Sequence, residues 1–318
     1  MTALPNVRGA SFSLWLIAAA VSIAAWTQPV QAQPAWVEKY RLPSPEIEKL
    51  PNGLELAWFV DSSPASLPLV DLAVLVRSGS RDDLPGKSGT AELLSNLLDK
   101  GAGGKDAQAL AHAIEKLGAT RYINADDDTF SIGLHGLAQD SDALLALLSD
   151  MALRPDLPQD EFGKEKRALL AKWDHIGDYA ETLATLAFQR ALLSNTSYAR
   201  GGLWNAREAS ELTLKDVADF HRTHFTPANT ILMVVGRLDR ATFRKKILDA
   251  FGAWTGGAPK REHRSYRNDF ALATHGQKLV LVDRPGLSQA QVRIGFEAPG
   301  MKDPDRYALA VGNTLLGE

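Results

Sequence analysis

The sequence contains no cysteine, so neither disulfide bonds nor thiol chemistry contribute to its stability or activity. It also lacks an apolar run long enough to span a bilayer comfortably, because the most apolar stretch, Phe12–Ala25, is too short. There is no excess of positive charge: the formal net charge of −3 argues against nucleic acid as a partner. The remaining composition, 45% hydrophobic and 23% charged over 318 residues, is ordinary for a globular chain of two domains.

Residues 1–32 have the pattern of a secretory signal peptide. Arg8 supplies a positive start, Phe12–Ala25 is the apolar core, and Val30 and Ala32 are small residues at positions −3 and −1 of a cleavage site. We expect cleavage after Ala32, which removes Arg8 and takes the net charge from −3 to −4. An uncleaved anchor is the alternative. With cleavage, we expect an exported protein with no stable membrane span.

A short amphipathic helix is predicted within Gly86–Lys105. Four leucines recur there at helical spacing, Leu93, Leu94, Leu97 and Leu98. Ser88 or Thr90 is available as the N-cap, and Gly101 is placed to end the helix.

This stretch resembles the zinc-binding helix of the pitrilysin/insulinase/mitochondrial processing peptidase family, which reads G-x-A-H-x-x-E-H-x-x-x-K-G. Gly89, Ala91, Lys100 and Gly101 match that frame. The resemblance also covers the order LPNGL, strand, loop, strand, GSRDD, helix from Leu50 onward, and the phrase FTPANTILMVVGRLD from Phe225 onward. It therefore extends over the whole chain after residue 32.

The metal-binding positions of the family are all altered. In such a motif two histidines hold the zinc and the glutamate between them is the general base. Here these positions hold Glu92, Ser95 and Asn96, and the family's spacing to its third ligand, a glutamate, leads to Lys172. Ser95 is too weak a base, Asn96 is a poor zinc ligand, and a lysine cation repels a metal. We therefore predict no catalytic residue and no bound zinc in this chain.

The fold implied is α+β, a duplicated unit of largely antiparallel sheet with helices on one face, the second unit incomplete. Beyond the strands at residues 55–60 and 69–77, we expect one strand at 121–134 and another at 231–235. Helices are predicted at 107–117, 141–153, 158–173, 179–193 and 213–224. The Gly-, Pro- and charge-rich residues 256–276 are interpreted as a linker between residues 33–255, the first domain, and 277–318.

Residues 277–318 are interpreted as the start of a second, homologous domain. Strands at 278–284 and 289–296 and a helix at 303–316 would repeat the opening order of the first domain. Members of the family continue for roughly another hundred residues, in line with ordinary domain size. The expectation is that this chain is C-terminally truncated. Arg306 and Tyr307 lie too early to be the Arg/Tyr pair of metal-free family subunits.

In relatives, peptide substrates lie along the strand that follows Gly118. By position this implies peptide contacts at Thr120, Tyr122, Asn124 and Asp126. A calcium site at Asp126, Asp127 and Asp128 is the weaker interpretation of those residues, compared with a solvated turn.

Two further features allow a metal-site interpretation. His221 and His224 form the only close histidine pair, and no third ligand is apparent. Glu165 matches a second acidic position of active relatives, and without a metal it is a surface helix residue. We favour the structural interpretation of both.

The resemblance implies a non-catalytic, zinc-free subunit of an exported, heterodimeric peptidase complex. It would close the chamber and help to bind peptide for a zinc-bearing paralogous subunit in the bacterial periplasm. One alternative is a zinc-dependent metalloendopeptidase that uses unrecognised ligands. Another is a peptide-binding protein that acts alone.

Overall fold

The computed structural model describes residues 44–61, 63, 66–176, 178–193, 196–199, 205–259, 279–286, 289–295, 300 and 302–317. Contacts divide the chain into residues 1–44 and 45–318, and the description below concerns the second unit. The predicted signal peptide at 1–32 lies outside the described residues, as does most of the predicted linker at 256–276. No helix within the described ranges is long and apolar enough to cross a membrane.

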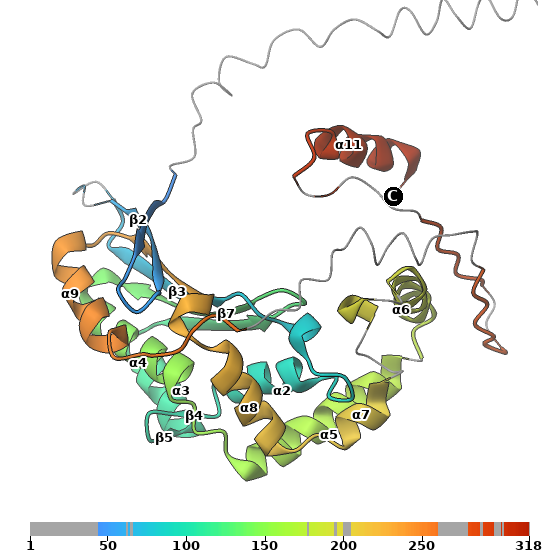
Figure 1. Ribbon diagram of the computed structural model, residues 1–318, viewed down its shortest axis with the longest axis horizontal. Helices are drawn as coiled ribbons and strands as arrows, with labels where there is room; N and C mark the ends of the chain where they lie inside the picture. The colour runs from blue at the N-terminus through green and yellow to red at the C-terminus, as the bar shows by residue number, and fades with distance from the viewer. Residues whose placement is uncertain are drawn as a thin grey trace, which may run out of the picture. The chain divides into compact units, whose positions relative to one another are not determined.

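The strands form a six-stranded mixed sheet in the order β1-β2-β8-β3-β7-β6 (Figure 1). All neighbouring strands are antiparallel except β2 and β8, which are parallel. The predicted α+β class with a largely antiparallel sheet is confirmed. The strands are β1 Glu46–Lys49, β2 Glu55–Val60, β3 Leu69–Val76, β6 Thr120–Ala125, β7 Phe130–Leu137 and β8 Thr230–Gly236. A separate two-stranded ribbon joins β4 Gly101–Ala102 to β5 Lys105–Asp106.

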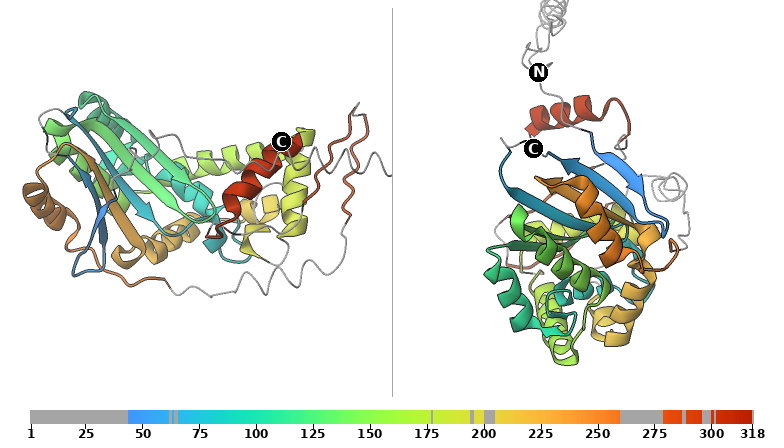
Figure 2. Two further views of the ribbon diagram at one scale, coloured as in Figure 1. Left: turned by 90° about the horizontal axis from the view of Figure 1, so that it is seen from above. Right: turned by 90° about the vertical axis from the view of Figure 1, so that its left-hand side faces the viewer.

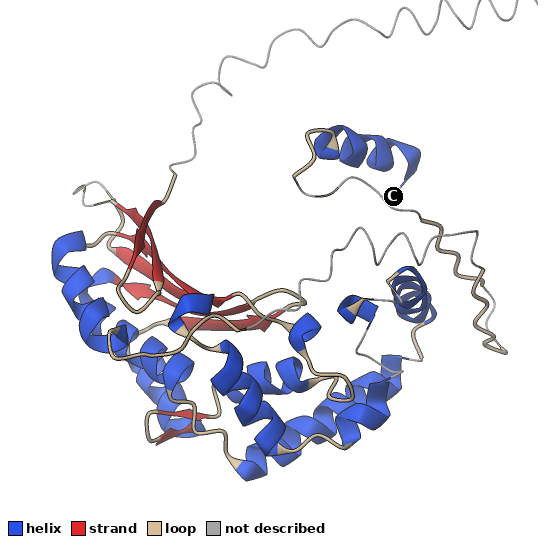
Figure 3. Ribbon diagram, in the orientation of Figure 1, coloured by secondary structure: helices blue, strands red, loops and turns tan. Residues whose placement is uncertain are grey.

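Helices pack on one face of this sheet, as predicted: residues 141–153 lie against β3 and β7, and residues 90–97 and 107–116 lie against β6 (Figures 2 and 3). Along β3 the alternate residues Val70, Leu72, Val74 and Val76 are at most 1% exposed, because they point toward the helices. The α-helices are α2 Thr90–Leu97, α3 Ala107–Lys116, α4 Ser141–Leu153, α5 Gln159–Ile176, α6 Ala180–Leu192, α7 Ala206–Ser210, α8 Leu214–His224, α9 Arg240–Phe251 and α11 Arg306–Gly317. Short 3₁₀ turns lie at η1 Ser80–Asp82, η2 Ala138–Asp140, η3 Ser197–Ala199 and η5 Pro227–Asn229.

The predicted ends of the α2 helix are wrong. Its N-cap is Gly89, in a left-handed conformation at φ +96°, and not Ser88 or Thr90. The Ser88 hydroxyl donates to Glu208 at 2.7 Å, and the Thr90 hydroxyl donates to the Lys87 carbonyl at 2.6 Å. The helix also ends before Gly101, at a C-cap on Leu98.

The single strand predicted at 121–134 is two strands. β6 and β7 form an antiparallel hairpin whose turn contains Asp126, Asp127 and Asp128. The sequence alternates across this region, but the turn contains neither glycine nor proline, and the break was therefore not recognised. The structure confirms the solvated turn that was favoured at the three aspartates, because they are exposed.

The second set of predicted strands is also wrong within the described residues. Residues 279–286 and 289–295 contain no strand. Their apolar side chains are not covered by a neighbour: Leu279 and Ile294 are about nine-tenths exposed. A strand is stable only when paired with a neighbour. The predicted helix is confirmed as α11, which begins at Arg306 instead of Asp303.

Candidate functional site

The α2 helix is positioned by a buried carboxylate that precedes it in the chain. Asp83, 3% exposed, accepts hydrogen bonds from the backbone N–H groups of Gly89 at 2.8 Å and Ala91 at 2.9 Å. These N–H groups at a helix start have no partner within the helix, so an anion beside them is stabilising. Gly89, at the start of α2, faces Trp173 of α5: a Cβ on Gly89 would lie only 3.0 Å from the Trp173 ring. The two helices are therefore closely packed at this point.

The altered metal positions on α2 and α5 meet as an ion pair. Lys172 Nζ lies 2.7 Å from Glu92 Oε1. The structure thus brings together two residues that the sequence separates by 80 positions. Of the four altered positions, only Glu92 still carries a metal-binding group. Its carboxylate is paired with the Lys172 ammonium.

The other two positions provide no replacement for a zinc ligand. The Ser95 hydroxyl donates to the Glu92 carbonyl one turn earlier, at 3.2 Å. Asn96 is a neutral amide and a poor zinc ligand. Within the described part of the chain, no cluster of three or more His, Cys, Asp or Glu could hold a metal ion. These residues do not fit zinc.

A chain of opposite charges continues from this helix to the sheet and to α5. Arg121 Nη2 lies 2.6 Å from Asp99, Lys100 Nζ lies 3.3 Å from Asp99, and Lys100 Nζ lies 3.5 Å from Glu165. Burial alone would lower the pKa of the Lys100 ammonium, but attraction to Asp99 and Glu165 outweighs burial and raises it. Glu165 was predicted to be a surface helix residue. In the structure it has a defined partner, because it forms an ion pair with Lys100.

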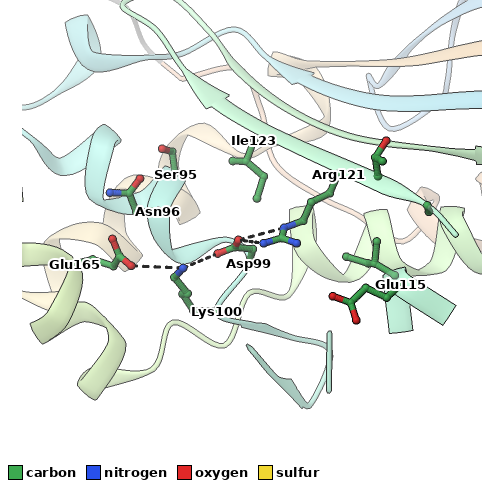
Figure 4. Close-up of a pocket in the computed structure, with 11 residues that line it drawn as sticks. Ser95, Asn96, Asp99, Lys100, Glu115, Arg121, Ile123 and Glu165 are labelled. Atoms are coloured by element: carbon green, nitrogen blue, oxygen red, sulfur yellow. Dashed lines mark hydrogen bonds and ion pairs between the residues drawn. The ribbon is translucent and has the colours of Figure 1, made fainter. Parts of the chain in front are cut away.

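These side chains surround a pocket of about 600 Å³ (Figure 4). It lies between α2, α3, α5 and the first half of β6 and falls within the size range of ordinary ligand sites. Its lining is Ser95, Asn96, Asp99, Lys100, Ile114, Glu115, Ala119, Thr120, Arg121, Ile123 and Glu165. The altered metal positions Ser95 and Asn96 thus share one pocket with the strand predicted to bind peptide.

The four residues predicted to contact peptide are not grouped around this pocket. Thr120 lines it. Tyr122 points to the opposite face of the sheet, where its ring covers Gly133 and its hydroxyl donates to Asp71 at 3.2 Å. Burial there, reinforced by the Asp71 charge, raises the pKa of Tyr122 to about 12.

Asn124 and Asp126 are also separate from the pocket lining. Asn124 alternates with Ile123 and so lies on the same face as Tyr122. Asp126 accepts bonds from the backbone N–H groups of Asp128 and Thr129, both at 2.7 Å. Its pKa is lowered, because these bonds outweigh the opposing effect of burial.

Sequence reasoning missed Arg121 and Ile123 as pocket residues. The available signal was the two-residue period of β6, which places Arg121 and Ile123 on the face opposite to Tyr122 and Asn124. Ile123 pairs with Ile132, which is fully buried on the helix-covered face, and this fixes the assignment.

The two histidines do not form a joint site. His221 Nε2 donates to the Ala152 carbonyl at 2.9 Å, whereas His224 Nδ1 lies 3.0 Å from the Ser78 hydroxyl. Burial lowers the pKa of His221, and its hydrogen bond to Ala152 only partly opposes this. Both rings have structural partners, in agreement with the favoured interpretation.

The aspartate turn is held by neighbouring elements. Asp128 accepts from the Tyr198 hydroxyl at 2.6 Å and forms an ion pair with Arg81, and Asp127 accepts from the Ser80 hydroxyl at 2.6 Å. The carboxylates of Asp127 and Asp128, which a calcium site would need as ligands, are therefore bonded to other side chains of the protein.

Comparison with known proteins places these features in a family. Residues 61–203 match the family model described as Insulinase (Peptidase family M16), and residues 211–318 match the one described as Peptidase M16 inactive domain. The two matches together extend over most of the described chain.

Similar proteins include subunits of larger assemblies. The chain is 24% identical over 277 residues to a probable mitochondrial-processing peptidase subunit beta of Arabidopsis thaliana, covering 86% of this chain and 51% of that protein. It is 23% identical over 282 residues to the human cytochrome b-c1 complex subunit 1, covering 87% of this chain and 56% of that protein. The chain thus spans little more than half the length of these relatives.

Solved structures agree with this result. A peptidase M16 inactive domain from Pseudomonas fluorescens superposes with a TM-score of 0.64 at 25% identity, covering 69% of this chain and 53% of that one. The comparisons therefore include a domain described as inactive.

Proposed function

This chain belongs to the insulinase (M16) peptidase family, and we propose that it is a non-catalytic, zinc-free member that binds peptide for a zinc-bearing partner. The observation that supports this most directly is the ion pair of Lys172 with Glu92. Zinc needs several neutral or anionic ligands around one point. In this chain that region instead holds a cation, a hydroxyl and an amide.

The ion pair also links α2 to α5, the two helices that carry the altered ligand positions. Because Lys172 and Glu92 are 64% and 31% exposed at their side chains, the pair contributes only about 0–1 kcal/mol to stability. The close packing of Gly89 against Trp173 is the larger contribution to the contact between these helices.

The proposed partner is a paralogous, exported subunit with an intact H-x-x-E-H motif. Two of the similar proteins are named as subunits, which supports an assembly with related chains. Export is proposed from the signal-like residues 1–32, with the bacterial periplasm as destination. Copurification with a paralogue that carries H-x-x-E-H would support this role. Its absence would favour a peptide-binding protein that acts alone.

Metal analysis tests the zinc-free proposal. The chain is refolded with zinc and dialysed, and its metal content is measured. We expect no stoichiometric zinc. One tightly held zinc per chain would contradict the proposal and support the alternative of an active metallopeptidase with unrecognised ligands. Loss of that zinc after His221→Gln and His224→Gln would locate it.

Restoring the ligands provides the complementary test. A variant with Glu92→His, Ser95→Glu, Asn96→His and Lys172→Glu is expected to bind one zinc, because the frame of α2 and α5 is retained. We expect its affinity to be roughly 10–100-fold below that of an intact site, because groups that orient the ligands are missing. The matched control carries only Ser95→Glu and Lys172→Glu and lacks the histidines. If the fourfold variant folds and binds no more zinc than this control, the assignment of these positions is wrong.

A further inference from the structure

The turn between β1 and β2 contains the only Asn-Gly pair of the sequence, Asn52 and Gly53. The Gly53 N–H donates to the Leu50 carbonyl at 2.9 Å and closes the turn. Gly53 has φ +95°, and a Cβ there would lie 3.2 Å from the Ala228 side chain, so glycine is required at this point.

The Asn52 side chain fastens this turn to the end of α9. Its Nδ2 donates to the carbonyl of Phe251, the last residue of α9, at 2.9 Å and to the carbonyl of Trp254 at 3.2 Å. These two bonds are called the Asn52 latch below. Its Oδ1 accepts from the Leu54 N–H at 3.2 Å. The last carbonyls of a helix lack partners within the helix, and the latch supplies one from 199 positions earlier in the chain.

An Asn-Gly pair that is free to move deamidates. The main-chain nitrogen of the glycine attacks the asparagine Cγ, and the new C–N bond closes a succinimide ring. The amide nitrogen takes up the proton that the glycine nitrogen loses and leaves as ammonia. Water then opens the ring to aspartate or isoaspartate. Glycine favours the attack because it has no side chain to obstruct the approach.

The folded chain opposes this reaction at both reacting groups. The Gly53 N–H is engaged with the Leu50 carbonyl, and the Asn52 carboxamide is held at its nitrogen by the latch and at its oxygen by Leu54. Attack therefore requires the turn to separate from the end of α9. Such local opening costs less free energy than global unfolding.

Deamidation would also prevent the latch from closing again. A carboxylate at position 52 has no N–H to donate and would face the carbonyl oxygens of Phe251 and Trp254. Its negative charge would lie at the C-terminal end of α9, which is the negative end of the helix dipole. The chain would lose a restraint at Trp254, directly before the predicted linker at 256–276.

We propose that Asn52 is a deamidation site gated by the contact of its turn with α9. Modification converts a reversible opening into permanent loss of the Asn52 latch. The reaction uses only this chain and water, and it is independent of peptide binding and of zinc. The modified protein holds the chain that follows α9 less firmly.

The rate is measured by peptide mass spectrometry after prolonged incubation of the chain at mildly alkaline pH, with isoaspartate separated by chromatography. We expect the folded chain to react roughly 10–100-fold more slowly than the same chain unfolded in urea, because the latch must open first. Trp254→Ala keeps the carbonyl that accepts from Asn52 and removes a ring whose centroid lies 6.1 Å from that of Phe251. It should accelerate the reaction several-fold in the folded chain.

Leu170→Ala is the matched control, because Leu170 is likewise a partly buried side chain packed against the core, on α5. It should leave the rate unchanged. Equal acceleration by both substitutions would overturn the gating by α9. A folded chain that reacts as fast as the unfolded one would overturn the protection, and an unfolded chain that does not react at Asn52 would overturn the site.

Two further measurements complete the test. If Trp254→Ala does not fold, urea below the unfolding transition opens the latch in the unaltered chain, and a rate that rises only with global unfolding contradicts local gating. Asn52→Asp should lower the midpoint of thermal unfolding by about 4–8 °C, more than Asn52→Ala does, because it adds repulsion to the loss of the donor. If Asn52→Asp is as stable as the unaltered chain, permanent loss of the latch is overturned.

Discussion

His221 is a single side chain whose protonation state is tied to folding. It donates to the Ala152 carbonyl from Nε2 and lies against the Phe225 ring, with ring centroids 4.5 Å apart. Burial lowers its pKa below the usual value of 6.5. As the pH falls through 6.5, the unfolded chain binds a proton before the folded chain does. The contribution of His221 to stability is therefore full above about pH 7 and decreases as the pH falls toward the folded-state pKa.

We expect His221→Gln to remove this dependence, since glutamine can donate to the same carbonyl and does not titrate. Urea unfolding at pH 7 and pH 5 gives the stability difference between the two proteins at each pH. That difference should move in favour of the variant at pH 5, by at most about 1.4 kcal/mol per pH unit. His112→Gln alters an exposed histidine and provides the control. A difference that stays constant from pH 7 to pH 5 would show that His221 titrates alike in both states.

At the residue scale, sequence reasoning relied on a local frame. Glu92, Ser95, Asn96 and Lys172 were identified from the resemblance to the family motif and its spacing, and the structure places Glu92 and Lys172 in contact. Sequence reasoning did not identify the capping residue of α2, because that residue lies outside the usual capping positions. Asp83 caps α2 from six and eight residues upstream, a spacing at which no capping pattern is expected.

The α2–α5 pair shows why a glycine is needed at one point of contact between two elements. Gly89 has φ +96°, and a Cβ there would meet Trp173 at 3.0 Å and Leu169 at 3.2 Å. We expect Gly89→Ala to destabilise the protein by about 2–4 kcal/mol, combining backbone strain with overpacking. Thermal and urea unfolding measure the change.

Gly86→Ala is the matched control for this prediction. Gly86 lies in the same segment at φ +79°, and a Cβ there would meet nothing within 4 Å. It should therefore incur only the backbone cost, about 1–2 kcal/mol. Equal destabilisation by both substitutions would mean that α5 moves away freely, and that the contact with Trp173 does not fix the position of α2.

At the scale of elements, five helices and three strands lie close to their predicted bounds, whereas α7 and α9 were not predicted. Each of α3, α4, α5, α6 and α8 follows its periodic apolar pattern to within a few residues, because a helix makes its hydrogen bonds within itself. Strands depend on partners that sequence does not reveal. β1 was not predicted, although it pairs with β2 at the other edge of the sheet, and two apolar runs after residue 278 were predicted as strands without a partner.

On the scale of the whole molecule, the hydrophobic core formed by the described residues is confined to one part of the chain. Among the residues that the structure describes, every core residue and every partly buried side chain packed against the core lies between Leu50 and Trp254. The described polar contacts of later residues with this part include Arg284 to Asp178 and Arg293 to Glu181. Surface ion pairs of this kind are worth about 0–1 kcal/mol each. We propose that residues 33–255 form a domain that folds independently of residues 277–318.

A chain that starts at Gln33 and ends at Pro259 tests this division. Because it retains the entire core, its midpoint of thermal unfolding should lie within about 4 °C of that of the chain ending at Glu318, the shift expected for about 1 kcal/mol. The shorter chain should also bind less of an apolar dye. Leu279, Leu281, Ile294 and Leu316, each between 88% and 93% exposed, are absent from it. A midpoint lowered by 10 °C or more would mean that the later residues stabilise the core through contacts beyond these ion pairs, and the division at 255 would then be wrong.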